Sequence, residues 1–241
     1  MAPTTVLITG ANRGLGEGLL KTLSCQTQSY RHCCEPKPAL SNLPAGEGSQ
    51  LIVVKWDASV DQDAFNAVAE LQEKHGIQYL DIVVANAGIS QICPTVANLK
   101  LDTLRSHMAP NVYGFLATYQ ATRPLLQKST KEPMFAPMGS TAGCLESQPP
   151  ITNAAYGPTK AAVNWYTIRI NAEDAWLNAF VLIPGWVQTD LGDRGARELG
   201  LEKAFIMVKE SCDGMMNLLA EITKEKHGGK MVGWNGGICP W

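Results

Sequence analysis

Hydrophobic and polar positions follow two alternating patterns along the chain. Short apolar runs are separated by longer segments in which apolar residues recur every three or four positions. This alternation is typical of β-α-β units and indicates an α/β fold, a doubly wound parallel sheet flanked by helices on both faces. Ligands of such a sheet bind beyond the carboxyl ends of its strands. The expected strands are Thr5–Thr9, Leu51–Trp56, Leu80–Ala85, Met134–Gly139, Asn178–Ile183 and Lys230–Trp234, and the expected helices span residues 14–24, 61–75, 100–127, 155–175 and 202–226.

Two segments depart from this simple pattern. A further strand is expected between the first helix and Leu51, and only Tyr30–Cys34, which two prolines follow, offers one. Pro137 lies inside the expected strand that precedes Ser140, and proline has no N–H to donate to a neighbouring strand. One hydrogen bond of the sheet must therefore be missing at Pro137.

The composition is that of an ordinary globular protein. The chain has 241 residues, of which 45% are hydrophobic and 17% are charged. This length allows one or two domains at roughly 150 residues per domain. A formal charge of −2 provides no strong field that would attract nucleic acid or an anionic membrane surface. We therefore expect neither of them as the main partner.

The placement of cysteine and histidine argues against disulfides and metal sites. The seven cysteines are odd in number and scattered, and they form no C-x-x-C pair, which favours a reducing compartment. The first residues do not resemble a secretory signal, and no apolar run reaches the ~18 residues that a membrane span needs. We expect a cytoplasmic protein without a metal, since the four histidines lie apart from one another and from carboxylates.

A glycine-rich segment, Thr9-Gly-Ala-Asn-Arg-Gly-Leu-Gly16, follows the first expected strand and opens the first helix. Its glycines permit a tight turn and the close approach of a diphosphate to backbone N–H groups at the positive end of the helix. The G-x-x-x-G-x-G spacing differs from the commonest dinucleotide fingerprint, and such a turn alone is also compatible with a structural role. Its position within a β-α-β unit favours nucleotide binding.

A second motif, Asn86-Ala-Gly88, follows the expected strand that ends at Ala85. Asparagine and glycine after a strand are ordinary turn residues. At the carboxyl end of a central strand, an asparagine side chain and exposed backbone can also line a cofactor cleft. The motif alone is compatible with both interpretations.

The third motif is Tyr156-Gly-Pro-Thr-Lys160, with Ser140 at the end of the preceding expected strand. On a helix, a spacing of four residues places Tyr156 and Lys160 on the same face. A phenol has an ordinary pKa of about 10. A neighbouring ammonium that stabilises the phenolate would let Tyr156 act as an acid or base near neutral pH. Taken alone, the motif also describes an exposed tyrosine and a solvated lysine.

Together these motifs resemble the short-chain dehydrogenase/reductase family. Segments 156–165 and 184–190 further resemble fungal members of the norsolorinic acid ketoreductase type. The resemblance implies one Rossmann-type domain, with a dinucleotide-binding half at about 1–130 and a catalytic, substrate-binding part at about 131–241. It implies an oxidoreductase that reduces a ketone, or oxidises a secondary alcohol, on a fungal secondary-metabolite intermediate. The motifs that carry the resemblance, in the order and spacing of the family, are Thr9–Gly16, Asn86–Gly88, Asn111, Ser140, Tyr156-x-x-x-Lys160 and Pro184-Gly185.

The resemblance also implies four catalytic residues. Tyr156 would donate a proton to the substrate carbonyl oxygen, and Ser140 would hydrogen-bond the same oxygen. Lys160 would lower the pKa of Tyr156 and bind the ribose next to the nicotinamide. Asn111 would support a water chain that returns a proton to Lys160, and its neighbour Pro110 is consistent with an irregularity in that helix.

The implied cofactor is NADP(H). Arg13 in the glycine turn favours it, because a guanidinium can pair with the additional 2′-phosphate. Cys34 stands at the end of the second strand, where related fungal sequences carry arginine, and Glu35 could instead bind a ribose hydroxyl and favour NAD(H). Arg31 and Lys37 keep NADP(H) the preferred assignment. Besides Tyr156 and Lys160, the residues expected to contact the cofactor are Gly10, Asn12, Arg13, Gly14, Leu15, Asp57, Asn86, Ala87, Gly88, Pro184, Val187 and Thr189.

A small-molecule substrate is expected between the loop Asn86–Gln91, the loop 141–153 and the segment 186–205. The last segment has two glycines amid polar residues and few internal anchors, which predicts a mobile lid over cofactor and substrate. The family further implies a homodimer or homotetramer formed through the helices at 100–127 and 155–175.

Two other functions are compatible with the same scaffold. A non-redox cyclase, isomerase or dehydratase could use Tyr156 and Lys160 with the cofactor structural or absent. The other is a binding protein that senses a nucleotide. The complete catalytic set argues against a binding protein, because such a protein does not need it.

Overall fold

The computed structural model describes residues 4–24, 30–34 and 49–241. Its order of elements alternates strands with helices, as the hydrophobic pattern predicts. The strands are β1 (Thr4–Ile8), β2 (Tyr30–Cys34), β3 (Gln50–Val53), β4 (Ile82–Ala85), β5 (Met134–Pro137), β6 (Asn178–Ala179), β7 (Val181–Ile183), β8 (Met231–Gly233) and β9 (Ile238–Cys239). The helices are α1 (Gly14–Ser24), α2 (Asp61–Glu73), α3 (Leu101–Met108), the π-helical turn η2 (Ala109–Tyr113), α4 (Gly114–Leu126), the 3₁₀ turn η3 (Thr141–Gly143), α5 (Gly157–Glu173), α6 (Asp190–Glu198), α7 (Val208–Glu221) and α8 (Lys224–His227).

Six parallel strands form the main sheet in the order β3-β2-β1-β4-β5-β6. The chain order reverses between β1 and β4, which neighbour each other, so the carboxyl ends of these two strands border the crevice where a doubly wound sheet binds its ligand. A smaller sheet has the order β7-β8-β9, with β9 antiparallel to β8. This is the doubly wound α/β architecture that the sequence predicts.

Pro137 divides the single strand that is expected at 178–183. On either side of the division, the N–H groups of Phe180 and Gly139 donate to the carbonyls of Phe135 and Leu182, so β6 and β7 both follow β5. In a regular parallel ladder, the hydrogen bond that falls between these two hydrogen bonds would be donated by the N–H of residue 137. Proline has none, and the regular ladder is interrupted there, which confirms the missing bond.

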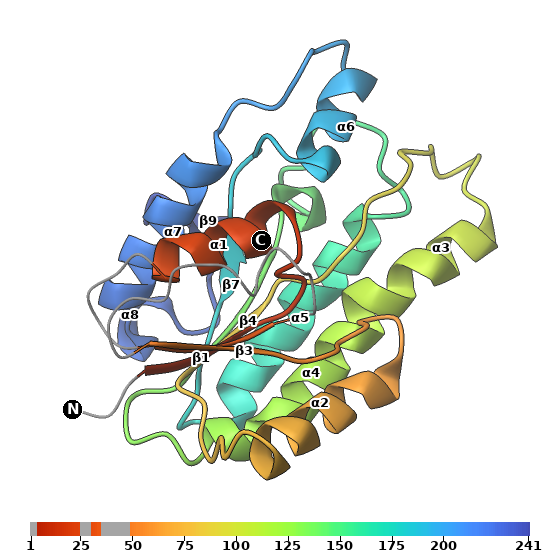
Figure 1. Ribbon diagram of the computed structural model, residues 1–241. Helices are drawn as coiled ribbons and strands as arrows, with labels where there is room; N and C mark the ends of the chain where they lie inside the picture. The colour runs from red at the N-terminus through yellow and green to blue at the C-terminus, as the bar shows by residue number, and fades with distance from the viewer. Residues whose placement is uncertain (1–3, 25–29, 35–48) are drawn as a thin grey trace.

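The two faces of the main sheet are covered by different helices. Figure 1 shows α2, α4 and α5 on one face and α1, α7 and α8 on the other. Successive residues of β1 point to opposite faces: Leu7 belongs to the core under α2 and α4, whereas Val6 and Ile8 belong to the core under α1 and α7. The run Val6-Leu7-Ile8 within this strand is therefore apolar without interruption, as expected for a strand covered on both sides.

Several boundaries differ from the prediction. The strand expected at Tyr30–Cys34 is present as β2, and the helix expected at 100–127 contains η2 at Pro110, the irregularity that this proline predicts. The helix expected to begin at residue 202 begins at Val208, because Ile206 donates its N–H to the carbonyl of Trp186 instead. The short helix α6 and the strand β9 were not predicted.

A buried carboxylate joins α4 to the end of α5. Asp174 is 4% exposed and accepts hydrogen bonds from Arg123 Nε at 2.8 Å and Arg123 Nη2 at 2.5 Å, and from the hydroxyl of Tyr119. Burial alone would raise the pKa of Asp174, but these bonds outweigh it and hold the pKa below its ordinary value. The charged form of Asp174 therefore stabilises the fold, and acidification removes this contribution as the carboxylate takes up a proton.

We expect Asp174→Asn to lower the free energy of unfolding by about 2 kcal/mol, less than the 3–5 kcal/mol of a fully buried broken pair. The expected loss is smaller because the Arg123 side chain is 41% exposed, and solvent weakens its interaction with Asp174. Urea denaturation measures the change. Glu173→Gln is the matched control, because it removes the neighbouring exposed pair with Arg169 and should cost about 0.5 kcal/mol or less. Equal losses in the free energy of unfolding of the two variants would contradict the stabilising role of charged Asp174.

Candidate active site

The glycine turn between β1 and α1 is shaped by positions that tolerate no side chain. Gly10 and Gly14 have φ angles of 65° and 56°, in the left-handed region that favours glycine. A Cβ on Gly16 would lie 2.3 Å from the carbonyl oxygen of Gly10 and 2.6 Å from Asn86 Nδ2. The turn therefore exposes backbone at the start of a helix, where a phosphate group can be bound.

Asn86 and Ala87 hold this turn against the end of β4. Asn86 Nδ2 donates to the carbonyl oxygens of Thr9 and Gly10 at 2.9 and 3.2 Å. The N–H of Ala87 donates to Thr9 Oγ1 at 3.0 Å. The sequence left Asn86-Ala-Gly88 either as an ordinary turn or as part of a cofactor cleft. In the structure, Asn86 binds the glycine turn and holds it in position. Thr9 was not among the expected site residues, although its place before Gly10 in the glycine motif is the signal that could have identified it.

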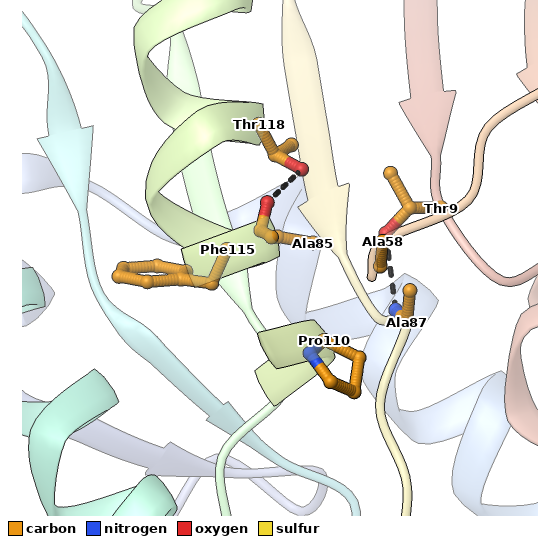
Figure 2. Close-up of a pocket in the computed structure, with 8 residues that line it drawn as sticks. Thr9, Ala58, Ala85, Ala87, Pro110, Phe115 and Thr118 are labelled. Atoms are coloured by element: carbon orange, nitrogen blue, oxygen red, sulfur yellow. Dashed lines mark hydrogen bonds between the residues drawn. The ribbon is translucent and has the colours of Figure 1, made fainter. Parts of the chain in front are cut away.

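A small cavity lies below this junction. Its volume is about 10 Å³, enough for about one water molecule. Figure 2 shows Thr9 beside Ala87 and Ala58 on one side of it and Pro110, Phe115 and Thr118 of η2 and α4 on the other. The cavity is too small for a nucleotide base.

Ser140 lies just beyond β5 and caps the turn η3. Its Oγ accepts the N–H of Ala142 at 3.1 Å. Gly143 packs so tightly against α5 that a Cβ on it would lie 2.6 Å from the carbonyl carbon of Lys160. The turn η3 therefore rests directly on the helix turn that carries Lys160, which brings Ser140 to the Tyr156-x-x-x-Lys160 motif.

Tyr156 and Lys160 lie at the start of α5, with Pro158 in its first turn as expected. Lys160 is 5% exposed, and its Nζ lies 5.5 Å from the centre of the Tyr156 ring. The same ammonium donates to the carbonyl of Met138 at 2.7 Å. Lys160 therefore ties the end of β5, next to Ser140, to the start of α5.

Burial dominates the ionisation of both residues. It raises the pKa of Tyr156 to about 12, while a hydrogen bond with Ser140 acts in the opposite direction. It lowers the pKa of Lys160 to about 8. The expected lowering of the Tyr156 pKa by Lys160 is therefore wrong for this structure, because burial dominates and the ammonium is hydrogen-bonded to the Met138 carbonyl. At neutral pH, Tyr156 is a protonated phenol.

Asn111 is buried in the π-helical turn η2, where π-helical turns often mark functional sites. Its Oδ1 accepts the N–H of Ile89 at 2.8 Å, and its Nδ2 donates to the Ile89 carbonyl at 2.9 Å and to Thr159 Oγ1 at 3.0 Å. A Cβ on Gly88 would lie 3.1 Å from Asn111 Oδ1 and 3.7 Å from Lys160 Nζ. The structure thus brings Asn111, Gly88 and Lys160 together. Thr159, inside the Tyr156-Lys160 motif, was not predicted as a site residue.

The remaining expected contacts come from two further strand ends. After β3, Asp57 accepts hydrogen bonds from the hydroxyl and the N–H of Ser59, and both bonds lower its pKa. After β7, Thr189 caps α6 by accepting the N–H of Gly192 at 3.1 Å. A Cβ on Gly14 would lie 3.6 Å from the methyl group of Thr189. The glycine turn and the start of α6 therefore face each other.

Other expected cofactor residues occupy the same region. Pro184 follows β7, and its carbonyl accepts the hydroxyl proton of Ser211. Val187 forms an isolated bridge with Ile206. Asn12, Arg13 and Leu15 lie in the glycine turn, where Arg13 is exposed and Asn12 and Leu15 are partly buried. Of the other residues that bear on the choice between NADP(H) and NAD(H), Arg31 and Cys34 lie in β2, whereas Glu35 and Lys37 lie outside the described residues.

The segment expected to have few internal anchors has several, which corrects that part of the prediction. We call residues 186–206 the α6 lobe. Trp186 Nε1 donates to the carbonyl of Gly192 at 2.8 Å, and Asp193 Oδ1 accepts the N–H of Ala204 at 2.9 Å. Trp186 and Phe205 stack edge to face, with ring centroids 5.3 Å apart. The lobe is internally ordered, so any motion over the site would move it as a unit.

Within the described residues, we also looked for a metal-binding cluster and for a helix that could span a membrane. In residues 4–24, 30–34 and 49–241, no group of three or more His, Cys, Asp or Glu side chains is placed to hold a metal ion. None of the helices described in these ranges combines the length and apolarity needed to cross a membrane.

Comparison with known proteins identifies the family. A profile of the short chain dehydrogenase family matches residues 4–199. Norsolorinic acid ketoreductase nor1 of Dothistroma septosporum is 39% identical, with 99% of this chain and 92% of that protein covered. The norsolorinic acid ketoreductase of Aspergillus parasiticus is 36% identical, with 99% and 91% covered. NADPH-bound carbonyl reductase from chicken fatty liver has the same fold, with a TM-score of 0.83, 24% identity and 100% of both chains covered. The chain is a member of the short-chain dehydrogenase family.

Proposed function

We propose that the protein is an NADP(H)-dependent ketoreductase that acts on a fungal secondary-metabolite intermediate. The observation that carries this proposal is the assembly of Ser140, Tyr156 and Lys160 beside Asn111 and the glycine turn, at the carboxyl end of the sheet. Relatives named as ketoreductases, aligned over nearly the whole chain, support the reaction. The NADPH-bound carbonyl reductase supports a nicotinamide cofactor.

Of the four catalytic residues, Tyr156 would act as the general acid, and the other three would position the substrate and cofactor or return the proton. Tyr156, protonated at neutral pH, would donate its proton to the substrate carbonyl oxygen. Ser140 would hydrogen-bond the same oxygen and hold it in place. Lys160 would bind the ribose hydroxyls, and Asn111 would support proton return to Lys160. A bound nicotinamide supplies the hydride.

The cofactor would lie across the two facing halves of the site. The glycine turn fits a diphosphate, because its positive φ angles and the exclusion of a Cβ at Gly16 leave backbone accessible at the start of α1. Asp57 would contact the adenine, and Pro184, Val187 and Thr189 the carboxamide. The exposed Arg13 would pair with the 2′-phosphate, which favours NADP(H) over NAD(H) even with Cys34 at the end of β2.

The reaction is tested with purified protein, NADPH or NADH, and a panel of aromatic polyketide ketones. Loss of reduced nicotinamide absorbance and the mass of the product are followed together. A ketoreductase produces one alcohol for each NADPH oxidised. Product formation without a change in nicotinamide redox state would overturn the proposal in favour of a cyclase, isomerase or dehydratase.

Reduction and its reverse should respond differently to pH. Because the pKa of Tyr156 is about 12 and that of Lys160 about 8, both groups are mostly protonated at about pH 7 and below, and the rate of ketone reduction should be nearly constant there. Alcohol oxidation needs the phenolate, whose fraction rises about tenfold per pH unit below the pKa. Initial rates in both directions across the pH range measure this. A rate of alcohol oxidation that falls as the pH rises would contradict the prediction.

We further propose that the α6 lobe is a lid that closes over cofactor and substrate as one unit. Limited proteolysis should cut within residues 186–205 more slowly when NADPH is present, because the closed lobe is less accessible. Cleavage in the exposed loop around Gln127 and Lys128, far along the sheet, is the internal control. Equal cleavage of the lobe with and without NADPH would count against the lid.

We also propose a homodimer or homotetramer formed through the helical segment from α3 to α4 and through α5. Tyr113, Trp165 and Ile168 are exposed apolar side chains on η2 and α5. A hollow of about 430 Å³ between α3 and the start of α5 is lined by Met108, Tyr113 and Pro158, among others. We propose a cytoplasmic location because the free thiols of Cys93, Cys144, Cys212 and Cys239 suit a reducing compartment.

A further inference from the structure

The segment that follows β4 is tied down at alternate residues. Each tie joins its backbone to a different neighbouring element, so the segment runs as an extended strap from the glycine turn to the loop before α5. The four ties join Ala87 to Thr9, Ile89 to Asn111, Gln91 to His107 and Cys93 to Thr152. Of the partners in these ties, His107 is a titratable side chain to which the proposed chemistry gives no role.

His107 is fully buried near the end of α3, about one helical turn before Asn111. Its Nε2 lies 3.1 Å from the backbone nitrogen of Gln91, and its Nδ1 lies 2.8 Å from the carbonyl oxygen of Thr103. A backbone N–H can only donate and a carbonyl can only accept. The two partners therefore require a neutral imidazole with its proton on Nδ1 and a free lone pair on Nε2.

The other side of the same peptide group is held by the α6 lobe. The peptide that joins Ser90 to Gln91 presents the N–H of Gln91 to His107 and the carbonyl of Ser90 to Arg194 Nη1, at 2.5 Å. In a trans peptide these two groups point in opposite directions. His107 and Arg194 consequently hold one peptide plane from opposite sides, and hydrogen bonds arranged in this way polarise and strengthen each other.

We infer that His107 is a positioning residue: it sets the orientation of the Ser90-Gln91 peptide, so that the Ser90 carbonyl faces Arg194 and can accept its hydrogen bond. Without an acceptor at His107, the N–H of Gln91 has no buried partner and the peptide is free to rotate. The Ser90 carbonyl then no longer faces Arg194, and the α6 lobe loses its shorter bond to this segment, with only the 3.4 Å contact from Arg194 Nη1 to the Gln91 carbonyl beside it. This inference rests on the proposed function, in which the α6 lobe covers the substrate.

The test compares His107→Phe, which keeps a ring but removes the acceptor, with His107→Gln, which returns an acceptor oxygen. We expect His107→Phe to raise KM for the ketone about tenfold, equivalent to about 1.4 kcal/mol, with little change in kcat. His107→Gln should restore KM. Arg194→Met should raise KM by a similar factor, and the double variant with His107→Phe should be no worse than either single variant, because both break the same link.

A second readout needs no substrate. Amide hydrogen exchange at Gln91 should be faster in His107→Phe than in wild type and should be slowed again in His107→Gln. Ser106→Ala, which removes the exposed neighbouring hydroxyl that bonds the same Thr103 carbonyl, should change neither exchange nor KM. If His107→Phe does not fold, Arg194→Met still has to raise KM.

The outcomes separate this inference from the proposed function. A wild-type protein that reduces none of the ketones would reject the proposed function, while exchange at Gln91 would still report on the His107 tie. With an active wild type, additive effects of His107→Phe and Arg194→Met on KM would overturn the inference. Unchanged exchange at Gln91 in His107→Phe, or an unchanged KM in Arg194→Met, would overturn it as well.

Discussion

Tyr156→Phe should lower kcat for ketone reduction by about 10²–10⁴-fold, the usual contribution of a positioned general acid. The substitution removes the proton that Tyr156 would transfer to the carbonyl oxygen, because burial keeps Tyr156 protonated at neutral pH. It leaves the ring in place over Lys160. Binding of NADPH, measured by fluorescence titration, should therefore stay within about twofold of wild type, since no hydrogen bond to a charged group is lost.

The control for Tyr156→Phe is Tyr113→Phe. Tyr113 lies on η2 near the same end of α5, but its side chain is 52% exposed. Removal of its hydroxyl should leave kcat unchanged. Retention of wild-type kcat by Tyr156→Phe would exclude general acid catalysis by Tyr156. A large fall in NADPH affinity would show instead that the hydroxyl serves to hold the cofactor.

The parts of the site that could be predicted are those in which the geometry admits few residue types. Gly10 and Gly14 occupy left-handed backbone, Gly16 has no room for a Cβ, and Asn86 reaches two carbonyls of the glycine turn. Such constraints leave a recognisable residue at a recognisable spacing. The same holds for the irregularity at Pro110, which follows from a property of proline itself.

The parts that could not be predicted depend on contacts that the pattern of apolar residues does not encode. The helix α6 contains Gly192 and Gly195, each of which costs a helix about 1 kcal/mol relative to alanine. It forms because Thr189 caps it and Asp193 holds the backbone of Ala204, neither of which local periodicity reveals. The pKa values of Tyr156 and Lys160 belong to the same class, because their direction is decided by burial and not by their spacing.

His107 illustrates the limit of judging a residue by its neighbours in sequence. In the sequence it is isolated from the other histidines and from carboxylates, and this isolation suggests no role for it. Its partners are backbone groups of Thr103 and Gln91, which have no sequence signature. Only the position of the strap after β4 shows what the imidazole contacts.

Gly16→Ala should weaken NADPH binding by about 10²-fold or more, since each hydrogen bond to a charged group contributes about 1.5–3 kcal/mol. The added methyl group would lie 2.3 Å from the carbonyl oxygen of Gly10, and backbone cannot move aside as a flexible side chain can. The turn must open, which also displaces Asn86 Nδ2 from its two carbonyl partners. Fluorescence titration with NADPH measures the loss, and thermal unfolding without cofactor shows how much of the fold is retained.

The matched control is Gly195→Ala on α6, where the new Cβ would meet only Trp186, at 3.8 Å or more. This variant should bind NADPH like wild type, because the glycine turn is untouched and the substitution favours the helix. NADPH affinity in Gly16→Ala close to that of wild type would mean that the diphosphate does not use the glycine turn. Equal losses in Gly16→Ala and Gly195→Ala would attribute the effect to general destabilisation, and the glycine turn would then lose its place in the proposed cofactor site.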